Sequence, residues 1–173
     1  RCEYGFKKWK KSNLWEPETF VDLVTLYQER FVFSPRNFQL ILSQTIEKTT
    51  NPGIVILEAP MGLGKTEAAL AASEQLSSKK GCSGLFFGLP TQATSNGIFK
   101  RIEQWTESIK GNNSDNFSIQ LVHGKAALNT DFIELPKGNT INMDDSENGS
   151  IFVNEWFSGR KTSALDDFVV GTV

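Results

Sequence analysis

The stretch 59–66 restricts the possible folds of this chain more than any other feature. It reads Ala-Pro-Met-Gly-Leu-Gly-Lys-Thr, follows the apolar run 54–57, and precedes residues typical of a helix. Gly62 and Gly64 allow the backbone to curl so that successive amide groups point into one concavity, where an anion binds. The N-terminus of the helix adds unpaired amides and a partial positive charge. With Ala59 in place of the usual first glycine, the pattern fits a phosphate-binding loop.

Two side chains at the end of this loop are predicted to act on a nucleoside triphosphate. The Lys65 ammonium is expected to reach the β- and γ-phosphates, and the Thr66 hydroxyl is expected to hold Mg²⁺. Lys65 and Thr66 are therefore the predicted catalytic residues, and Thr66 is the predicted metal ligand. The alternative is a glycine-rich turn between a strand and a helix that binds nothing.

The hydrophobic pattern alternates between strand-like and helix-like segments. Strands are predicted over 54–57, 84–89, 117–122 and 168–170, and helices over 17–30, 38–49, 67–76 and 93–109. This alternation predicts an α/β fold with a mostly parallel sheet and helices on both faces. Residues 1–30 are predicted to be a linker and N-terminal helical extension, and the polar residues 125–149 to be an insertion or a mobile loop.

Composition narrows the classes of partner. The chain has 173 residues, enough for one domain with a substantial core, and its net charge of −2 gives no global basic field for nucleic acid. Cys2, Cys82 and the single histidine, His123, cannot form a typical zinc site, and they give no sign of a disulfide framework. A reducing cytoplasm fits this cysteine content, and no apolar segment is long enough to span a bilayer. We therefore predict a cytoplasmic protein with no membrane partner.

Polar residues follow two of the predicted strands. Thr91 and Gln92 come after the strand over 84–89, and Thr172 comes at the end of the last strand. In an open α/β sheet, ligands gather outside the carboxyl ends of the strands, and these hydroxyl and amide groups suit the phosphates of a nucleic-acid strand. Helix capping is the alternative for each site alone. Together, downstream of a phosphate-binding loop, they favour a motor that tracks a nucleic-acid strand.

Gln39 is a candidate for reading a nucleotide base. It lies upstream of the loop in a Pro-Arg-x-x-Gln setting that includes Arg36. A glutamine amide donates and accepts at once, which matches the N6/N7 edge of adenine. Phe31 or Phe33 is expected to cover the base. The alternative is that Gln39 is an exposed helix residue.

Several of these motifs resemble those of superfamily 2 helicases. The loop 59–66 resembles motif I, residues 90–92 resemble motif Ia, and Gln39 resembles the adenine-reading Q motif. Other stretches are more discriminating and resemble the CRISPR-associated Cas3 helicases. These are residues 121–124, 156–161 and 168–173.

The resemblance implies that residues 31–173 form a RecA-like P-loop domain, the first lobe of an ATP-driven 3′-to-5′ translocase. It implies ATP and Mg²⁺ as cofactors. The implied partners are single-stranded DNA, the Cascade complex, an HD nuclease domain and a second RecA-like lobe, with DNA contacts from Thr91, Gln92 and Thr172. The implied cofactor-binding residues are Arg36, Gln39, Pro60, Met61, Gly62, Leu63, Gly64, Lys65, Thr66 and Glu67.

Some features of such helicases are not expected within this chain. The family places an acidic DExH-type motif after the strand that ends at Val173. An HD nuclease needs several histidines, so His123 is expected to be a structural or DNA-side residue. Alone, the chain is expected to bind nucleotide without hydrolysing it. The alternatives to a Cas3-type motor lobe are a lobe of a DEAD-box-like helicase, or a P-loop nucleotide-binding module or kinase without motor activity.

Overall fold

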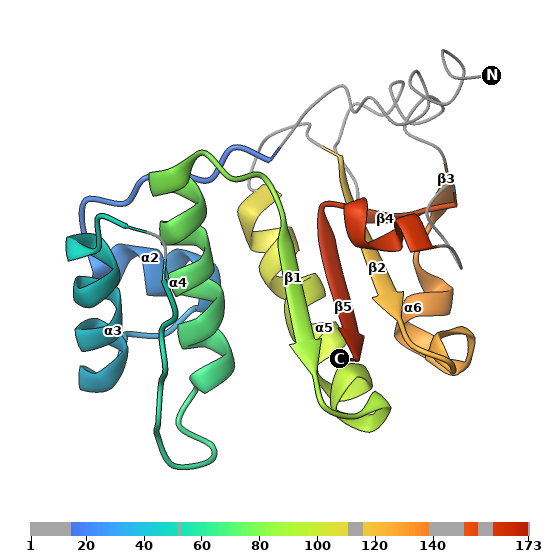
Figure 1. The fold of residues 1–173 in the computed structure, drawn as a ribbon, viewed down its shortest axis with the longest axis horizontal. Coiled ribbons are helices and arrows are strands. Elements are labelled where there is room, and N and C mark those ends of the chain that lie inside the picture. Colours follow the sequence, from blue (N-terminus) through green and yellow to red (C-terminus); the bar gives the residue numbers. More distant parts are fainter. Residues whose placement is uncertain (1–14, 52, 111–115, 139–150, 156–160, 173) are drawn as a thin grey trace. The chain divides into compact units, whose positions relative to one another are not determined.

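The computed structural model describes residues 15–51, 53–110, 116–138, 151–155 and 161–172 (Figure 1). The chain divides into two compact units. The helical unit is Glu16–Ser83, and the sheet unit is Arg1–Trp15 together with Gly84–Val173. In the described residues, no helix has the length and apolar content needed to cross a bilayer.

Three helices form the described part of the helical unit. They are α2 (Leu23–Phe31), α3 (Asn37–Lys48) and α4 (Lys65–Lys80). α3 confirms the helix predicted over 38–49, and α4 extends the one predicted over 67–76 at both ends. The buried face of α4 carries Ala68, Ala71 and Ala72, and these side chains contact the apolar faces of α2 and α3. Because alanine is small, both helices can approach the backbone of α4 closely.

The first helix begins later than the prediction of 17–30, which was wrong at its N-terminal end. The carboxylate of Asp22 accepts hydrogen bonds from the amides of Val24 and Thr25, at 3.3 and 3.0 Å. The hydroxyl of Thr25 also donates to this carboxylate, and these bonds lower the pKa of Asp22. Asp22 therefore acts as the N-cap that starts α2, a stronger start signal than the acidic residues before it.

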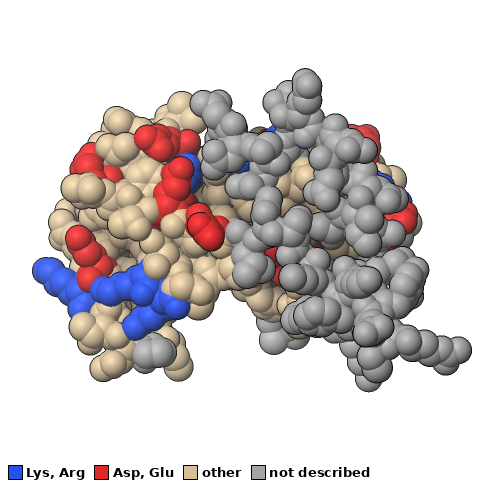
Figure 2. All heavy atoms as spheres, turned by 90° about the horizontal axis from the view of Figure 1, so that it is seen from above, with Lys and Arg blue, Asp and Glu red and all other residues tan. Residues whose placement is uncertain are grey.

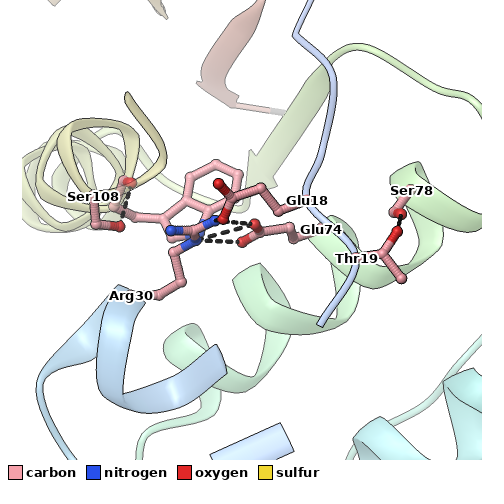
Figure 3. A network of polar contacts seen from close by, with 7 residues as sticks. Glu18, Thr19, Arg30, Glu74, Ser78 and Ser108 are labelled. Atoms are coloured by element: carbon pink, nitrogen blue, oxygen red, sulfur yellow. Dashed lines mark hydrogen bonds and ion pairs between the residues drawn. The ribbon is translucent and has the colours of Figure 1, made fainter. Parts of the chain in front are cut away.

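A buried ion pair joins α2 to α4 (Figure 3). The guanidinium of Arg30 donates to the carboxylate of Glu74, with the closest atoms 2.8 Å apart, and both side chains are almost fully buried. The same guanidinium contacts the more exposed Glu18. A further hydrogen bond of 2.9 Å joins the hydroxyls of Thr19 and Ser78. The segment before α2 is thus held against α4 by polar contacts.

The prediction of a buried strand over 54–57 was wrong. These residues are extended without strand pairing, and Ile54 and Ile56 are 93% and 82% exposed. A strand requires a neighbouring strand that forms hydrogen bonds with its amide and carbonyl groups, and the described part of the helical unit contains no strand. The apolar run alone does not supply that neighbour.

The described part of the sheet unit contains a five-stranded sheet in which every pair is parallel. Its strands are β1 (Leu85–Leu89), β2 (Phe117–Val122), β3 (Lys137–Gly138), β4 (Ile151–Asn154) and β5 (Phe168–Thr172), in the order β1-β5-β2-β4-β3. The predicted strands over 84–89, 117–122 and 168–170 are confirmed, and so is the α/β class with a parallel sheet. Consecutive strands that are not neighbours require crossover connections, and α5 (Gln92–Lys110) supplies the first.

An aromatic cluster forms the core between α5 and the sheet. Phe168 of β5 lies against Trp105 of α5, with ring centroids 5.4 Å apart, and against Phe117 of β2 at 5.8 Å. Trp15 contacts both Trp105 and Phe168 edge-on. α5 confirms the helix predicted over 93–109 and packs against β1, β2 and β5 (Figure 1).

Part of the segment predicted as an insertion has regular structure. η1 (Ala126–Leu128), α6 (Thr130–Glu134) and β3 lie in its first half, and 139–149 lie outside the described residues. Residues 1–14, and 156–160 of the stretch 156–161, are also outside them. η3 (Lys161–Leu165) precedes β5.

On the helical unit, basic and acidic side chains lie side by side on the surface (Figure 2).

Candidate functional site

The glycine-rich loop leads from the extended residues 54–57 into α4 through two left-handed positions. Gly62 has φ 76° and Gly64 has φ 91°, a region that favours glycine. Gly64 occupies the N-cap position of α4 and has no side chain that could accept from the first-turn amides. The beginning of α4 thus presents main-chain donors and the positive end of its dipole, as an anion site requires.

Lys65 spans the loop that precedes it. Its ammonium donates to the carbonyl of Ala59 at 2.6 Å, while the side chain stays exposed. Thr66 and Glu67 follow in the first turn of α4 and are partly buried. The acidic charge of Glu67 at this end of the helix is favourable for the helix dipole. The Lys65 ammonium therefore places a positive charge beside the loop.

Gln39 connects α3 to the end of the loop. Its Nε2 donates to the carbonyl of Gly64 at 3.0 Å, and its Oε1 accepts from the amide of Arg36 at 2.8 Å. The side chain is fully buried, so the alternative of an exposed helix residue is wrong. Both ends of the amide are engaged within the protein.

The other residues predicted to bind the cofactor differ in their exposure. Met61 is 91% exposed, and Pro60 is also exposed. Leu63 is partly buried, and Arg36 is exposed at the start of α3. The structure therefore brings Gln39 into direct contact with the end of the loop at Gly64, whereas Arg36 is exposed.

The predicted nucleic-acid residues lie at the carboxyl edge of the sheet. β5 lies between β1 and β2, with Leu89 beside Thr172 and Gly171 beside Val122. Thr91 and Gln92 follow β1 directly, so they share this edge with Thr172. Ligands of open parallel sheets bind at this edge.

Thr91 also caps α5. Its hydroxyl accepts from the amide of Thr94 at 3.2 Å and pairs with the Thr94 hydroxyl at 2.9 Å. Its carbonyl accepts from Ser95. Thr91 therefore caps α5, which confirms the structural alternative for this residue. Thr91 is also exposed, and its contact with a DNA phosphate stays a prediction.

Asn96 beside this edge was not predicted to act there, whereas His123 was expected to be a structural or DNA-side residue. Asn96 of α5 bonds His123, which follows β2, and the amide nitrogen of Gln92 lies close to Gly124. Asn96 stands four residues after Gln92, so both lie on one face of α5. This spacing is the sequence feature that could have placed Asn96 beside the predicted DNA contact Gln92. Among the described residues, no group of three or more His, Cys, Asp or Glu side chains could hold a metal ion.

Comparison with curated proteins identifies the family. The chain is 95% identical over 173 residues to the CRISPR-associated nuclease/helicase Cas3 of Streptococcus thermophilus. It is 35% identical over 144 residues to the CRISPR-associated endonuclease/helicase Cas3 of Thermus thermophilus. The chain belongs to the Cas3 family. It covers 19% and 15% of the lengths of these Cas3 relatives.

Solved Cas3 structures share the fold. The chain matches T. fusca Cas3-ATP with a TM-score of 0.67 and 28% identity, covering 88% of this chain and 16% of that one. It matches T. fusca Cas3-AMPPNP with a TM-score of 0.65, covering 90% and 16%. No protein-family model matches the sequence. The similarity to Cas3 structures confirms the prediction of a RecA-like α/β fold.

Proposed function

We propose that this chain forms the ATP-binding lobe of a Cas3-type, ATP-dependent single-stranded DNA translocase or helicase that acts with Cascade. The geometry of the loop carries this proposal. Gly62 and Gly64 have positive φ, and Lys65 crosses the loop at the N-terminus of α4. Similarity to Cas3 structures named for bound ATP, ADP and AMPPNP supports the assignment to a nucleotide.

The residues of the loop fit the phosphates of a nucleotide. Lys65 already donates to an uncharged acceptor, the carbonyl of Ala59, and a phosphate oxygen is a stronger acceptor for an ammonium. The glycine at the N-cap of α4 leaves room for main-chain contacts. Bound ATP with Mg²⁺ would supply the phosphoryl chemistry that drives the motor. Residues 60–67 would hold its phosphates, and Thr66 would ligate the metal.

Gln39 and Arg36 are proposed to meet the adenine. Gln39 is buried, and its amide is bonded to Arg36 and to the carbonyl of Gly64, so an adenine contact would require the side chain to exchange one of these bonds. Thr91, Gln92 and Thr172 are proposed to contact the DNA backbone through neutral donors, with little dependence on base sequence. Residues 31–173 are proposed to be the RecA-like lobe, and 125–149 an insertion within it. An HD nuclease domain and a second lobe are its proposed partners.

Replacing Lys65 tests the proposal in the full-length protein. Lys65→Ala should lower DNA-stimulated ATP turnover by about 100-fold, because the cation on the transferred phosphate is lost. Strand unwinding should be lost with it. Lys48→Ala, at an exposed lysine in the last turn of α3, should change neither. ATP turnover that survives in Lys65→Ala would contradict the assignment.

The isolated chain gives a second test. Purified residues 1–173 should bind ATP with Mg²⁺ weakly and show no turnover that rises with DNA, because the proposed DExH acid and second lobe are missing from it. Calorimetric titration with ATP and a phosphate-release assay measure the two properties. Vigorous hydrolysis by the isolated chain would favour a self-sufficient P-loop enzyme over a motor lobe.

A further inference from the structure

The ring of His123 is held by two hydrogen bonds that fix its proton. Its Nδ1 lies 3.1 Å from the main-chain nitrogen of Lys125, and its Nε2 lies 2.9 Å from Oδ1 of Asn96. The amide of Lys125 can only donate, so Nδ1 must be the acceptor. The proton of the neutral ring then lies on Nε2 and is donated to Asn96. Burial lowers the pKa of His123, which favours this neutral form.

These bonds join the turn after β2 to the first turns of α5. Val122 is registered with Gly171, so His123 follows at the level of Thr172. A Cβ added at Gly124 would lie 3.5 Å from the Nε2 of Gln92. The turn at 123–125 is therefore packed beside the proposed DNA-contact residues Gln92 and Thr172 at the carboxyl edge of the sheet.

The residues proposed so far at this edge carry no charge. Thr91, Gln92 and Thr172 are neutral donors, whereas binding to a single strand depends on cations that replace its counterions. Lys125 is exposed and follows Gly124 directly, so it brings a positive charge to this edge. Its main-chain nitrogen is the group that His123 holds.

We propose that Lys125 is a further contact to a DNA phosphate, and that the neutral His123 ring is a positioning residue that fixes the turn carrying it. The inference rests on the proposed function, in which this edge binds single-stranded DNA. Asn96 completes the arrangement by orienting the ring from α5. Lys125 supplies charge, and Gln92 and Thr172 supply neutral donors to neighbouring phosphates.

Salt dependence of DNA binding measures the charge of Lys125 directly. The probe is a fluorescein-labelled oligothymidylate, titrated with the full-length protein by anisotropy at several NaCl concentrations without nucleotide. Lys125→Ala should weaken binding about fivefold and make the slope of log K against log salt shallower by about 0.7, the value for one phosphate of a single strand. Lys125→Arg should keep the slope. Lys100→Ala, at an exposed lysine farther along α5, should also keep it.

Variants of His123 test the positioning role. His123→Ala should reproduce the shallower slope, and adding it to Lys125→Ala should weaken binding no further, because both act through one contact. His123→Asn retains an oxygen that can accept from the Lys125 amide, as in an Asx turn, and should recover most of the slope. A general loss of folding would lower affinity in every variant and leave the slope unchanged.

The outcomes separate this inference from the proposed function. If Gln92→Ala and Thr172→Val weaken DNA binding while Lys125→Ala leaves the slope unchanged, the inference is wrong and the proposed function stands. If none of these variants affects binding, the edge does not bind the strand and the proposed function fails. A slope changed by Lys125→Ala and unaffected by His123→Ala overturns the role of His123.

Discussion

The side-chain amide of Gln39 donates a hydrogen bond to the carbonyl of Gly64, 3.0 Å away. The same carbonyl accepts the first main-chain bond of α4, from the amide of Ala68. The residue that ends the phosphate-binding loop is therefore held from two sides, by α3 and by the helix that it starts. This contact links the candidate base-reading residue to the candidate phosphate site without a ligand.

Substituting the two glycines of the loop should have unequal effects on folding. A Cβ at Gly64 would lie 2.9 Å from Nε2 of Gln39, whose amide is bonded at both ends and cannot withdraw freely. A Cβ at Gly62 would meet nothing within 4 Å. Both positions have positive φ, so Gly62→Ala should cost about 1 kcal/mol of unfolding free energy and Gly64→Ala about 2–3 kcal/mol. Urea denaturation followed by circular dichroism measures the difference. Equal costs would show that contact with Gln39 is unimportant.

Gln39→Ala should weaken ATP binding through two separable effects. Losing the bond to Gly64 should raise KM for any nucleoside triphosphate, because the end of the loop is less fixed. Losing an adenine contact should raise KM for ATP more than KM for GTP. The two effects together should raise KM for ATP about tenfold. Steady-state assays of the full-length protein with each nucleotide separate the effects. An equal rise for ATP and GTP would limit Gln39 to its bond with Gly64.

Sequence patterns predicted the elements that carry a strong local signal. The 3.6-residue periodicity located α3 and α5, and short apolar runs located β1, β2 and β5. The glycines of the loop predicted its left-handed positions, since few other residues adopt them. In these cases the signal lies within one segment, although the strands complete their pairing with partners far along the chain.

Features that depend on distant residues could not be predicted. The run 54–57 has the composition of a strand, yet pairing depends on a neighbour elsewhere in the chain. Asp166 and Asp167 are both buried. The Asp167 carboxylate accepts from the main-chain amide of Ser118, and both carboxylates contact the Ser118 hydroxyl. The partner of Gln39 likewise became visible only in the structure. Contacts between segments are set by tertiary packing, which single-sequence patterns do not encode.

Breaking the buried pair between Arg30 and Glu74 should be costly. Arg30→Met leaves a buried carboxylate without its closest cation, so it should lower the unfolding free energy by about 3–5 kcal/mol. Glu18→Gln, which changes a half-exposed partner of the same guanidinium, should cost less than about 1 kcal/mol. Replacing both Arg30 and Glu74 with apolar residues should cost less than the sum of the single changes. Urea titrations of the parent protein, the single variants at Arg30 and Glu74, the double variant and Glu18→Gln test the order, and a double variant as costly as that sum would contradict it.

Tyr27 should make the fold sensitive to alkali. Burial raises the pKa of Tyr27 to about 12, with a smaller opposing effect of Ser43. Above pH 10 the unfolded chain releases this proton and the folded chain keeps it, so stability falls as pH rises from about 10 to about 12. At about 1.4 kcal/mol per pKa unit, the full loss is about 3 kcal/mol.

Tyr27→Phe removes the ionisable hydroxyl and keeps the ring against Phe31 and Phe33. The variant should therefore lose less stability between pH 10 and pH 12 than the parent protein. Urea midpoints at a series of alkaline pH values measure this, and phenolate absorbance follows the titration itself. Parallel curves for the two proteins would mean that Tyr27 ionises equally well in the folded chain, which contradicts its burial against α4.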